Sequence, residues 1–256
     1  MQSIESNGLD LSKKKVLIRL DLNVPIFKNK IIDTNRIDKI IPSLRFLIDK
    51  KAKIIILSHV GRPKGKIVKE LSLSPVREDL INKLNTEINL ITTNLKDLNP
   101  NNIDKSFNQK IVMFENLRFY KEEEENNLNF AKHLASFGDI YVNEAFSCSH
   151  RKHASVYGIT KFIPSYAGLQ LNAEINALRK LTKDIKKPIT CIIGGSKIST
   201  KINVIKNLIP KFDYLIFVGG MANNILKYNK YNIGKSISEL NCDKLIDEIF
   251  SLSKNN

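Results

Sequence analysis

The stretch that most constrains the fold is KVLIRLDLNVP, which runs from Lys15 to Pro25. Its first half is a nearly continuous apolar run, as is typical of a strand that is buried on both faces of a parallel sheet. Polar side chains then follow abruptly at Asp21 and Asn23. Ligands of open α/β sheets bind outside the carboxyl ends of the strands. The stretch therefore predicts either one side of a small-ligand site or an ordinary turn rich in Asp, Asn and Pro.

Similar apolar runs occur at residues 52–58, 111–114 and 139–143, and a polar segment follows each of them. A helix expected from about residue 34 adds Arg36 in its first turn, where a surface arginine and an arginine at an anion site are alternative interpretations. The carboxyl ends of parallel strands share one edge of a sheet, so these segments predict a basic cluster that binds a small, multiply anionic ligand. The candidate residues after the three runs are His59, Gly61, Arg62, Arg118 and Arg151.

The net charge of +15 permits a nucleic-acid-binding hypothesis. Lys supplies most of the 41 basic residues, and these side chains are scattered rather than arranged in a stripe with interleaved aromatics. Composition therefore favours a small-molecule site over nucleic acid. No apolar run reaches the roughly 18 residues of a membrane span, and the N-terminus lacks the apolar core of a signal peptide. The 3 Cys residues are far apart, which argues against a disulfide framework or a zinc site and favours a cytoplasmic protein.

One helix is expected between the apolar runs at 111–114 and 139–143. The acidic run Glu122 to Glu125 predicts its solvated start, because acidic side chains favour that end of the helix dipole. The helix is expected to extend to Phe137, before Gly138.

The second half of the sequence opens with a long expected helix, Gly168 to Asp184, that would join two lobes. Apolar runs at 189–193 and 214–218 then lead into two glycine-rich turns, GGSKISTK and GGMANN. Glycines at a strand-to-helix turn, followed by Lys197 and Lys201, are typical of a phosphate cradle, although the spacing is not that of a P-loop.

Six segments resemble motifs of the phosphoglycerate kinase family in order and spacing: RLDLNVP, HVGRPKG, ENLRFY, AFSCSHRKHAS, GGSKISTKI and FVGGMANN. The resemblance extends from about Leu9 to the last residues. It implies an α/β protein of two Rossmann-like lobes with parallel sheets: a 3-phosphoglycerate lobe at 1–166, an inter-lobe helix at 167–186 and a nucleotide lobe at 187–256. The implied activity is a kinase reaction of glycolysis, reversible phosphoryl transfer between 1,3-bisphosphoglycerate and ADP, which gives 3-phosphoglycerate and ATP.

The resemblance also implies a role for each matched residue. Asp21 and Asn23 would hold the hydroxyl and carboxylate side of the glycerate, and Arg36 would face the transferring phosphoryl group. The basic patch for the non-transferring phosphate would consist of His59, Arg62, Arg118 and Arg151, and Gly61 would also contact the substrate. Nucleotide binding would fall to Gly194, Gly195, Lys197, Lys201, Gly219 and Gly220, and the catalytic residues would be Arg36, Lys197 and Lys201. Mg²⁺ would accompany ATP or ADP, and no metal ligand is assigned in this chain.

The length departs from the family pattern, because members of the family are considerably longer than a chain that ends at Asn256. The second lobe shows only two strands, too few to bury both faces of a doubly wound sheet. The family's later acidic and glycine-rich motifs, which hold nucleotide and magnesium, are not matched. We therefore expect a monomeric fragment with an incomplete second lobe and no measurable kinase activity of its own. A lobe that only binds 3-phosphoglycerate and a basic nucleic-acid binder are the alternatives.

Overall fold

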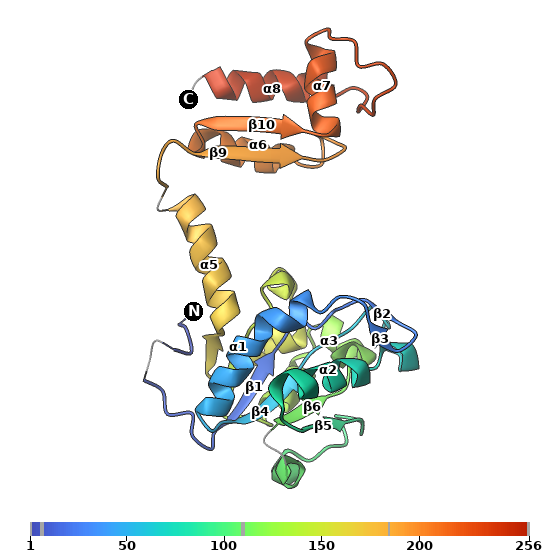
Figure 1. Ribbon diagram of the computed structural model, residues 1–256, viewed down its shortest axis with the longest axis vertical. Helices are drawn as coiled ribbons and strands as arrows, with labels where there is room; N and C mark the ends of the chain where they lie inside the picture. The colour runs from blue at the N-terminus through green and yellow to red at the C-terminus, as the bar shows by residue number, and fades with distance from the viewer. Residues whose placement is uncertain (1, 6–7, 109–110, 184, 255–256) are drawn as a thin grey trace. The chain divides into compact units, whose positions relative to one another are not determined.

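The computed structural model describes residues 2–5, 8–108, 111–183 and 185–254, and these form two compact units (Figure 1). The first unit extends to Ile175, and the second begins at Asn176. Each unit has its own sheet and its own apolar core.

A six-stranded sheet forms the centre of the first unit, and all of its strand pairs are parallel. The central strand pairs Arg19 with Leu57 on one side and with Asn143 on the other. This arrangement confirms the parallel α/β sheet predicted from the apolar runs. The short last strand was not among the predicted elements, because three residues are too few to give a periodic pattern. The strand order is β5 (Ile88–Ile91), β6 (Ile111–Phe114), β4 (Lys53–Leu57), β1 (Lys15–Arg19), β7 (Ile140–Asn143) and β8 (Ser165–Ala167).

Alternate residues of β1 enter two different apolar clusters, which explains why its three middle residues are all apolar. Val16 and Ile18 belong to a cluster that includes the apolar faces of α1 (Asn35–Asp49) and α2 (Ser74–Leu84). Leu17 belongs to a second cluster on the opposite face of the sheet. Strand β1 is therefore covered on both faces.

The single helix expected after β6 is wrong, because the structure has two: α3 (Lys121–Glu124) and α4 (Leu128–Ala135). Asn126 separates them with a left-handed φ of 54°. Asn127 then caps α4, since its side-chain oxygen accepts hydrogen bonds from two backbone amides, each at 3.0 Å. The expectation that the acidic run is solvated is also wrong for Glu123, which is fully buried.

Shorter elements complete the first unit. A hairpin pairs β2 with β3 in the antiparallel sense. Single turns of 3₁₀ or π helix follow several strands, and two of them lie directly after β6 and β7 at the carboxyl edge of the sheet. The bounds are β2 (Ile26–Phe27), β3 (Lys30–Ile31), η1 (Lys69–Leu71), η2 (Pro100–Asn108), η3 (Leu117–Phe119), η4 (Phe146–Cys148), η5 (Ala154–Gly158) and η6 (Ile159–Lys161).

Helix α5 (Leu169–Thr182) occupies most of the segment expected to join the lobes, and Asp184, its expected last residue, lies outside the described residues. The buried carboxylate of Glu144 accepts hydrogen bonds from the backbone amides of Gln170 at 3.0 Å and Leu171 at 2.9 Å. An α-helix leaves its first amides without partners, so these bonds attach the start of α5 to the end of β7.

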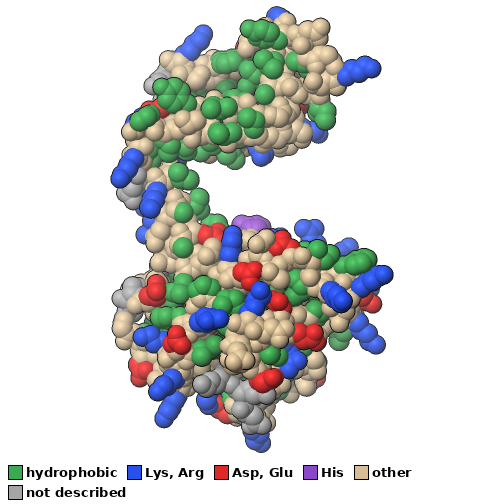
Figure 2. Space-filling model, in the orientation of Figure 1, with side chains coloured by type: hydrophobic (Ala, Val, Ile, Leu, Met, Phe, Trp, Pro, Cys, Tyr) green, Lys and Arg blue, Asp and Glu red, His purple; other side chains and the backbone are tan. Residues whose placement is uncertain are grey.

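The second unit has a two-stranded parallel sheet of β9 (Thr190–Gly194) and β10 (Tyr214–Val218). One face of this sheet contacts the core of the unit, whereas Tyr214 and Ile216 on the other face are 62% and 47% exposed. Figure 2 shows hydrophobic side chains on the surface of this unit. No helix within the described residues is both long enough and apolar enough to cross a membrane. The remaining elements are α6 (Ile202–Leu208), η7 (Ile209–Lys211), α7 (Gly220–Tyr228) and α8 (Asp243–Lys254).

Candidate functional site

The candidate site lies at the carboxyl edge of the six-stranded sheet. Strands β6, β4, β1 and β7 are neighbours and run parallel, so the segments that follow them share this edge. These segments carry Arg118, His59, Asp21 and Arg151, respectively. The structure thus brings together four segments that are far apart in the sequence.

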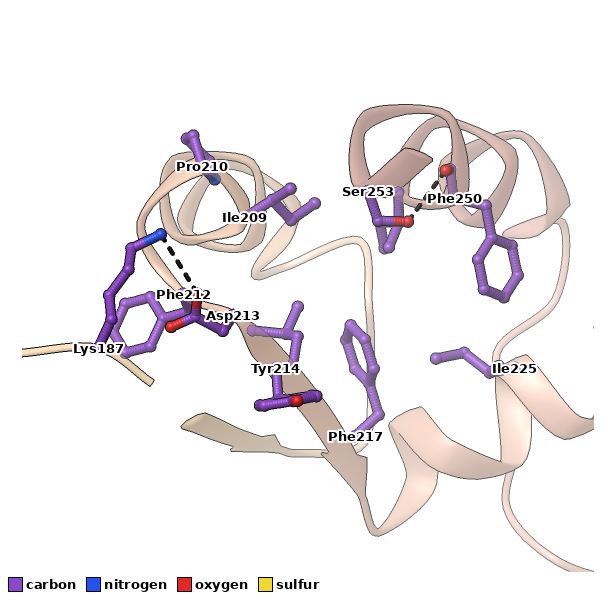
Figure 3. A pocket seen from close by; sticks show the side chains of 12 residues that line it. Lys187, Ile209, Pro210, Phe212, Asp213, Tyr214, Phe217, Ile225, Phe250 and Ser253 are labelled. Carbon is purple, nitrogen blue, oxygen red and sulfur yellow. Dashed lines mark hydrogen bonds and ion pairs between the residues drawn. The ribbon is translucent and has the colours of Figure 1, made fainter. Parts of the chain in front are cut away.

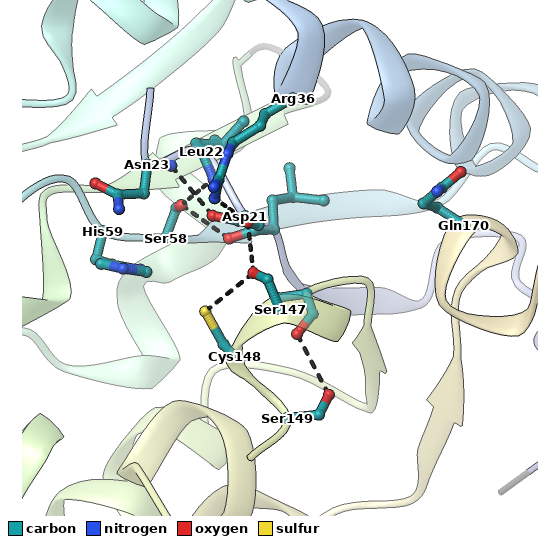
Figure 4. Close-up of polar contacts among 12 residues, drawn as sticks. Asp21, Leu22, Asn23, Arg36, Ser58, His59, Ser147, Cys148, Ser149 and Gln170 are labelled. Atoms are coloured by element: carbon teal, nitrogen blue, oxygen red, sulfur yellow. Dashed lines mark hydrogen bonds and ion pairs between the residues drawn. The ribbon is translucent and has the colours of Figure 1, made fainter. Parts of the chain in front are cut away.

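Asp21 is the centre of a small polar cluster that Figure 4 shows. One of its carboxylate oxygens accepts hydrogen bonds from the Arg36 guanidinium and, at 2.5 Å, from the Ser147 hydroxyl. Its other oxygen accepts from the backbone amide of Asn23 at 3.3 Å. The Arg36 side chain remains 49% exposed, and a hollow of about 210 Å³ beside the pair is also lined by Lys39. Arg36 is therefore held in place by Asp21 while its cationic group stays accessible.

Gly61 connects two of the candidate residues through its backbone. Its amide donates to Asn23 Oδ1 at 2.8 Å, and its carbonyl accepts from Arg118 Nη1 at 2.7 Å. Its φ is +65°, and a Cβ atom at this position would lie 2.7 Å from a methyl group of Leu71. Glycine is therefore required here for local packing and conformation, whatever ligand approaches the loop.

The three candidate arginines differ in exposure. Arg118 is 2% exposed, and its Nε lies 3.5 Å from a carboxylate oxygen of Glu124. Burial lowers the pKa of Arg118 from its ordinary value, and the Glu124 carboxylate opposes this shift. Arg151 is half-buried and donates to the His150 ring at 3.2 Å, whereas Arg62 is exposed and has no hydrogen bond or ion pair to a described residue. The site thus contains one buried and one exposed guanidinium, with Arg151 between these extremes.

His59 is 2% exposed and contacts Arg19, the last residue of β1. Its Nδ1 lies 2.7 Å from Arg19 Nη2. Burial, and then the positive charge of Arg19, hold the pKa of His59 far below its ordinary range. The imidazole is therefore a neutral hydrogen-bonding group at physiological pH.

Two further residues of this network, Glu123 and Ser155, are not candidates on sequence grounds. The amide and hydroxyl of Ser155 both donate to the buried carboxylate of Glu123, at 2.9 and 2.6 Å. An acidic run gives no sign of which member is buried, and Ser155 belongs to no periodic pattern. Arg19 did offer a signal, because it is a charged residue inside an apolar run.

The second unit brings its two glycine-rich turns together. The amide of Met221 donates to the carbonyl of Gly195 at 2.9 Å, and a Cβ atom on Gly220 would lie 3.0 Å from the Ser196 Cα. Gly195, Gly219 and Gly220 line a hollow of about 470 Å³. This close backbone approach leaves room for a group such as a phosphate beside the turns.

The lysines of these turns are not among the lining residues of that hollow, although Lys201 Nζ lies 3.7 Å from where a Cβ atom of Gly195 would be. The ammonium of Lys201 donates to the carbonyl of Gly194, the last residue of β9, at 3.1 Å. Lys197 is exposed. The geometry therefore groups three of the predicted glycines directly and leaves both lysines outside the lining.

A different hollow of the second unit, of about 710 Å³, lies beside β10 (Figure 3). Phe212, Phe217 and Phe250 are among its lining residues, and an ion pair of 3.2 Å joins Lys187 to Asp213 at one side. Most of its lining residues are apolar, and Lys187, Asp213 and Ser253 add polar groups to the lining.

Within the described residues, no group of three or more His, Cys, Asp or Glu side chains is arranged to hold a metal ion. The residues present therefore give no basis for assigning a metal ligand among the described residues.

Comparisons with known proteins give a consistent result. The family model described as "Phosphoglycerate kinase" matches residues 6–256. The chain is 47% identical over 254 residues to a phosphoglycerate kinase of Wolbachia pipientis subsp. Culex pipiens (strain wPip), covering 99% of this chain and 63% of that relative. It is 40% identical over 253 residues to a phosphoglycerate kinase of Moorella thermoacetica, covering 99% of this chain and 64% of the relative.

The fold agrees with a solved structure. The phosphoglycerate kinase from Coxiella burnetii superimposes with a TM-score of 0.88 at 39% identity, over 98% of this chain and 63% of that structure. This chain thus spans about 63% of the length of the Wolbachia and Coxiella proteins that it matches. The likeness of sequence and of fold shows that the chain belongs to the phosphoglycerate kinase family.

Proposed function

We propose that this chain carries the phosphoglycerate-binding site and part of the nucleotide-binding site of a phosphoglycerate kinase. That enzyme would transfer a phosphoryl group reversibly between 1,3-bisphosphoglycerate and ADP. The observation that carries the proposal is the basic cluster at one sheet edge, in a chain that belongs to this family. A cluster of this charge beside one carboxylate suits a ligand with several negative groups.

Different groups of the ligand would bind to different residues of the cluster. Arg62, Arg118 and Arg151 would hold the non-transferring phosphate, because guanidinium groups donate parallel hydrogen bonds to phosphate oxygens. Asp21 and Asn23 would contact the hydroxyl and carboxylate side of the glycerate. The exposed Arg62 would become ordered on binding, whereas the buried Arg118 is already in place.

The transfer step would need positioning and positive charge rather than a base. The acceptor is already a carboxylate, so no proton has to be removed before it attacks the transferring phosphorus. Arg36 would stabilise charge on the oxygens of the transferring group, and its ion pair with Asp21 supports this role by limiting its freedom. In a chain that turns over, Arg36→Ala would therefore lower kcat more than it raises KM.

The nucleotide would bind at the glycine-rich turns of the second unit. The hollow beside Gly195, Gly219 and Gly220 supports a phosphate site there. Gly194, Lys197 and Lys201 remain proposals for the same site, with the lysines turning toward the phosphates on binding. Mg²⁺ would enter with ATP or ADP as part of the substrate.

The proposed lobes follow one another along the chain and are joined by a helix. The triose lobe would extend over residues 1–166, the inter-lobe helix over 167–186 and the nucleotide lobe over 187–256. The three free cysteines support a cytoplasmic location. The protein would be a monomer and would bind no nucleic acid.

Calorimetric titration of the chain with 3-phosphoglycerate tests the proposal. Arg62→Ala should weaken binding by about 1.5–3 kcal/mol, the range of a charge-assisted hydrogen bond. Arg45→Ala is the matched control, because Arg45 is exposed and donates to the Lys83 carbonyl at 3.1 Å, away from the strand ends. Equal affinity of the two variants would contradict the role of Arg62, and no binding by the unmodified chain would contradict the proposed site.

A further inference from the structure

The buried guanidinium of Arg19 makes its hydrogen bonds to other residues of the protein. The side chain is 1% exposed. Its Nε donates to the Ser155 hydroxyl at 2.9 Å, its Nη1 donates to the Leu20 carbonyl, and its Nη2 faces His59 Nδ1 at 2.7 Å. None of these partners is a ligand, so Arg19 acts on the site through its neighbours.

The contact between Arg19 and His59 determines where the imidazole carries its proton. A guanidinium in a protein keeps all of its protons and has no acceptor, so Nη2 can only donate. His59 Nδ1 must therefore accept, and it can do so only without a proton of its own. In a neutral imidazole the single proton then resides on Nε2.

We infer that Arg19 fixes His59 as the neutral tautomer protonated on Nε2, so that His59 offers the bound anion one directional N–H and no charge. The part of this inference that concerns the anion rests on the proposed function. His59 Nε2 makes no hydrogen bond to a described residue, so its proton is available to a ligand. Arg19 is in this sense a positioning residue for His59.

The other charged groups around His59 favour the same state. Arg118 follows β6, and Arg151 and His153 follow β7; all three disfavour a positive charge on the ring, in addition to Arg19. Burial acts in the same direction and is the largest cause of the low pKa of His59. In this site the arginines therefore supply positive charge, and His59 supplies one directional N–H donor.

Arg19 itself needs a counter-charge, and Glu123 provides it. The Ser155 hydroxyl accepts from Arg19 and donates to Glu123 Oε1 at 2.6 Å, so a single hydroxyl joins the two charged groups. Glu123 is fully buried, and its carboxylate lies 3.8 Å from the His153 ring. The positive and negative charges are thus joined through one buried hydroxyl, and an opposite charge offsets the cost of burying Arg19.

Nitrogen-15 NMR of the histidine rings tests the inference on the free chain, without any ligand. The chain has 4 His residues, and loss of a signal in His59→Gln identifies His59. We expect its Nε2 to be protonated and its Nδ1 to be unprotonated from about pH 8 to about pH 5, a range across which an ordinary histidine titrates. Protonation of both nitrogens within that range, or a proton on Nδ1 alone, would overturn the inference.

Two variants separate the contact with His59 from the general integrity of the network. Arg19→Met removes the donor, and we expect His59 to lose its single tautomer and to titrate at higher pH. Glu123→Gln disturbs the same buried network but keeps the contact between Arg19 and His59, so the tautomer should persist. Unchanged His59 signals in a folded Arg19→Met protein would contradict the inference. If Arg19→Met does not fold, the pH series of the unmodified chain decides the matter alone.

Affinity for 3-phosphoglycerate gives an independent measurement. If His59 carries no charge, the ratio of Kd at about pH 5.5 to Kd at about pH 8 should agree within about twofold between the unmodified chain and His59→Gln. A tenfold steeper gain in affinity at low pH in the unmodified chain would show a charged imidazole. Absence of binding in both proteins would contradict the proposed function, whereas the NMR result would still decide the tautomer.

Discussion

Each unit contains one serine whose amide and hydroxyl both donate to the same glutamate carboxylate. In the first unit Ser155 donates to Glu123, at 2.9 Å from the amide and 2.6 Å from the hydroxyl. In the second unit the amide of Ser199 donates to Glu239 at 3.1 Å, and its hydroxyl donates to the other carboxylate oxygen. Glu123 is fully buried, whereas Glu239 is partly exposed. The same hydrogen bonds therefore have different consequences, because water can replace the serine in only one of the two units.

The strands of the two sheets also differ in how deeply their side chains are buried. Ile18 on β1 is fully buried, and Ile216 on β10 is 47% exposed, although each lies in a run of apolar residues within its strand. Strand β1 has a neighbour on each side and apolar clusters on both faces. Strand β10 has one neighbour, and only one of its faces contacts the core of the unit. The apolar sequence of a strand shows which side chains could be buried. The strands and helices packed around it determine how much of their surface is buried.

The largest expected effect is that of removing the buried carboxylate. Glu123→Ala should lower the free energy of unfolding of the first unit by about 3–5 kcal/mol, because it leaves the buried charge of Arg19 without its counter-charge. The matched change in the second unit, Glu239→Ala, should cost less than about 1 kcal/mol, since water can satisfy Ser199. Hydrogen exchange resolved by peptide measures each unit separately. Similar losses in the two units would break the comparison.

A change in the core should have the next largest effect. Ile18→Ala should destabilise the first unit by about 2–5 kcal/mol, because the surrounding clusters cannot close the cavity that it leaves. Ile216→Ala should change the stability of the second unit by less than about 1 kcal/mol, because much of this side chain is already in contact with water. The same exchange experiment reports both values. A large loss from Ile216→Ala would show that the exposed face of β10 is covered in solution.

Lowering the pH should destabilise the two units to different extents, and we expect this difference to be smaller than those caused by the substitutions above. All 4 His residues lie in the first unit. His59 has a lowered pKa in the folded state, so below about pH 6.5 the unfolded state binds the extra proton, and stability falls as the pH falls. One such histidine contributes a slope of about 1.4 kcal/mol per pH unit, and His59→Gln should remove that contribution.

The second unit should respond only at lower pH. Burial acts to raise the pKa of Glu239, but the hydrogen bonds from Ser199 and the Ile198 amide and the charge of Lys197 together lower this pKa overall. A carboxylate with a lowered pKa stabilises the fold above the pKa of the unfolded state and loses that contribution as the pH falls through the folded value. We therefore expect peptides around Ser199 to keep their protection until the pH falls below about 4.3. Loss of protection in both units at the same pH would contradict this account.

The sequence permits prediction of the features that depend on local pattern. Strands β6 and β10 have the bounds expected from their apolar runs. Parallel pairing follows from their unbroken apolar character, and the shared carboxyl edge follows from parallel pairing. This reasoning is sufficient to group Asp21 with His59.

The rest depends on contacts between distant residues. The burial of Glu123 depends on Ser155, which is 32 residues away, and on Arg19 beyond it. No local pattern records such a network, so an acidic run that contains a core residue is indistinguishable from a solvated one. The break at Asn126 is also missed, because a residue at left-handed φ leaves only a weak signal within a helical stretch. Of the two, Glu123 is linked to His59 of the candidate site through Ser155 and Arg19.

The central claim is that the basic edge of the first unit holds a phosphoglycerate, and hydrogen exchange with and without 3-phosphoglycerate tests it most directly. The account predicts slower exchange in the segments after β1, β4, β6 and β7, which contain Asp21, His59, Arg118 and Arg151. The glycine-rich turns at 194–201 and 219–224 should exchange at unchanged rates, because they are proposed to await the nucleotide. Protection confined to those turns, or no protection in either unit at saturating ligand, would contradict the claim.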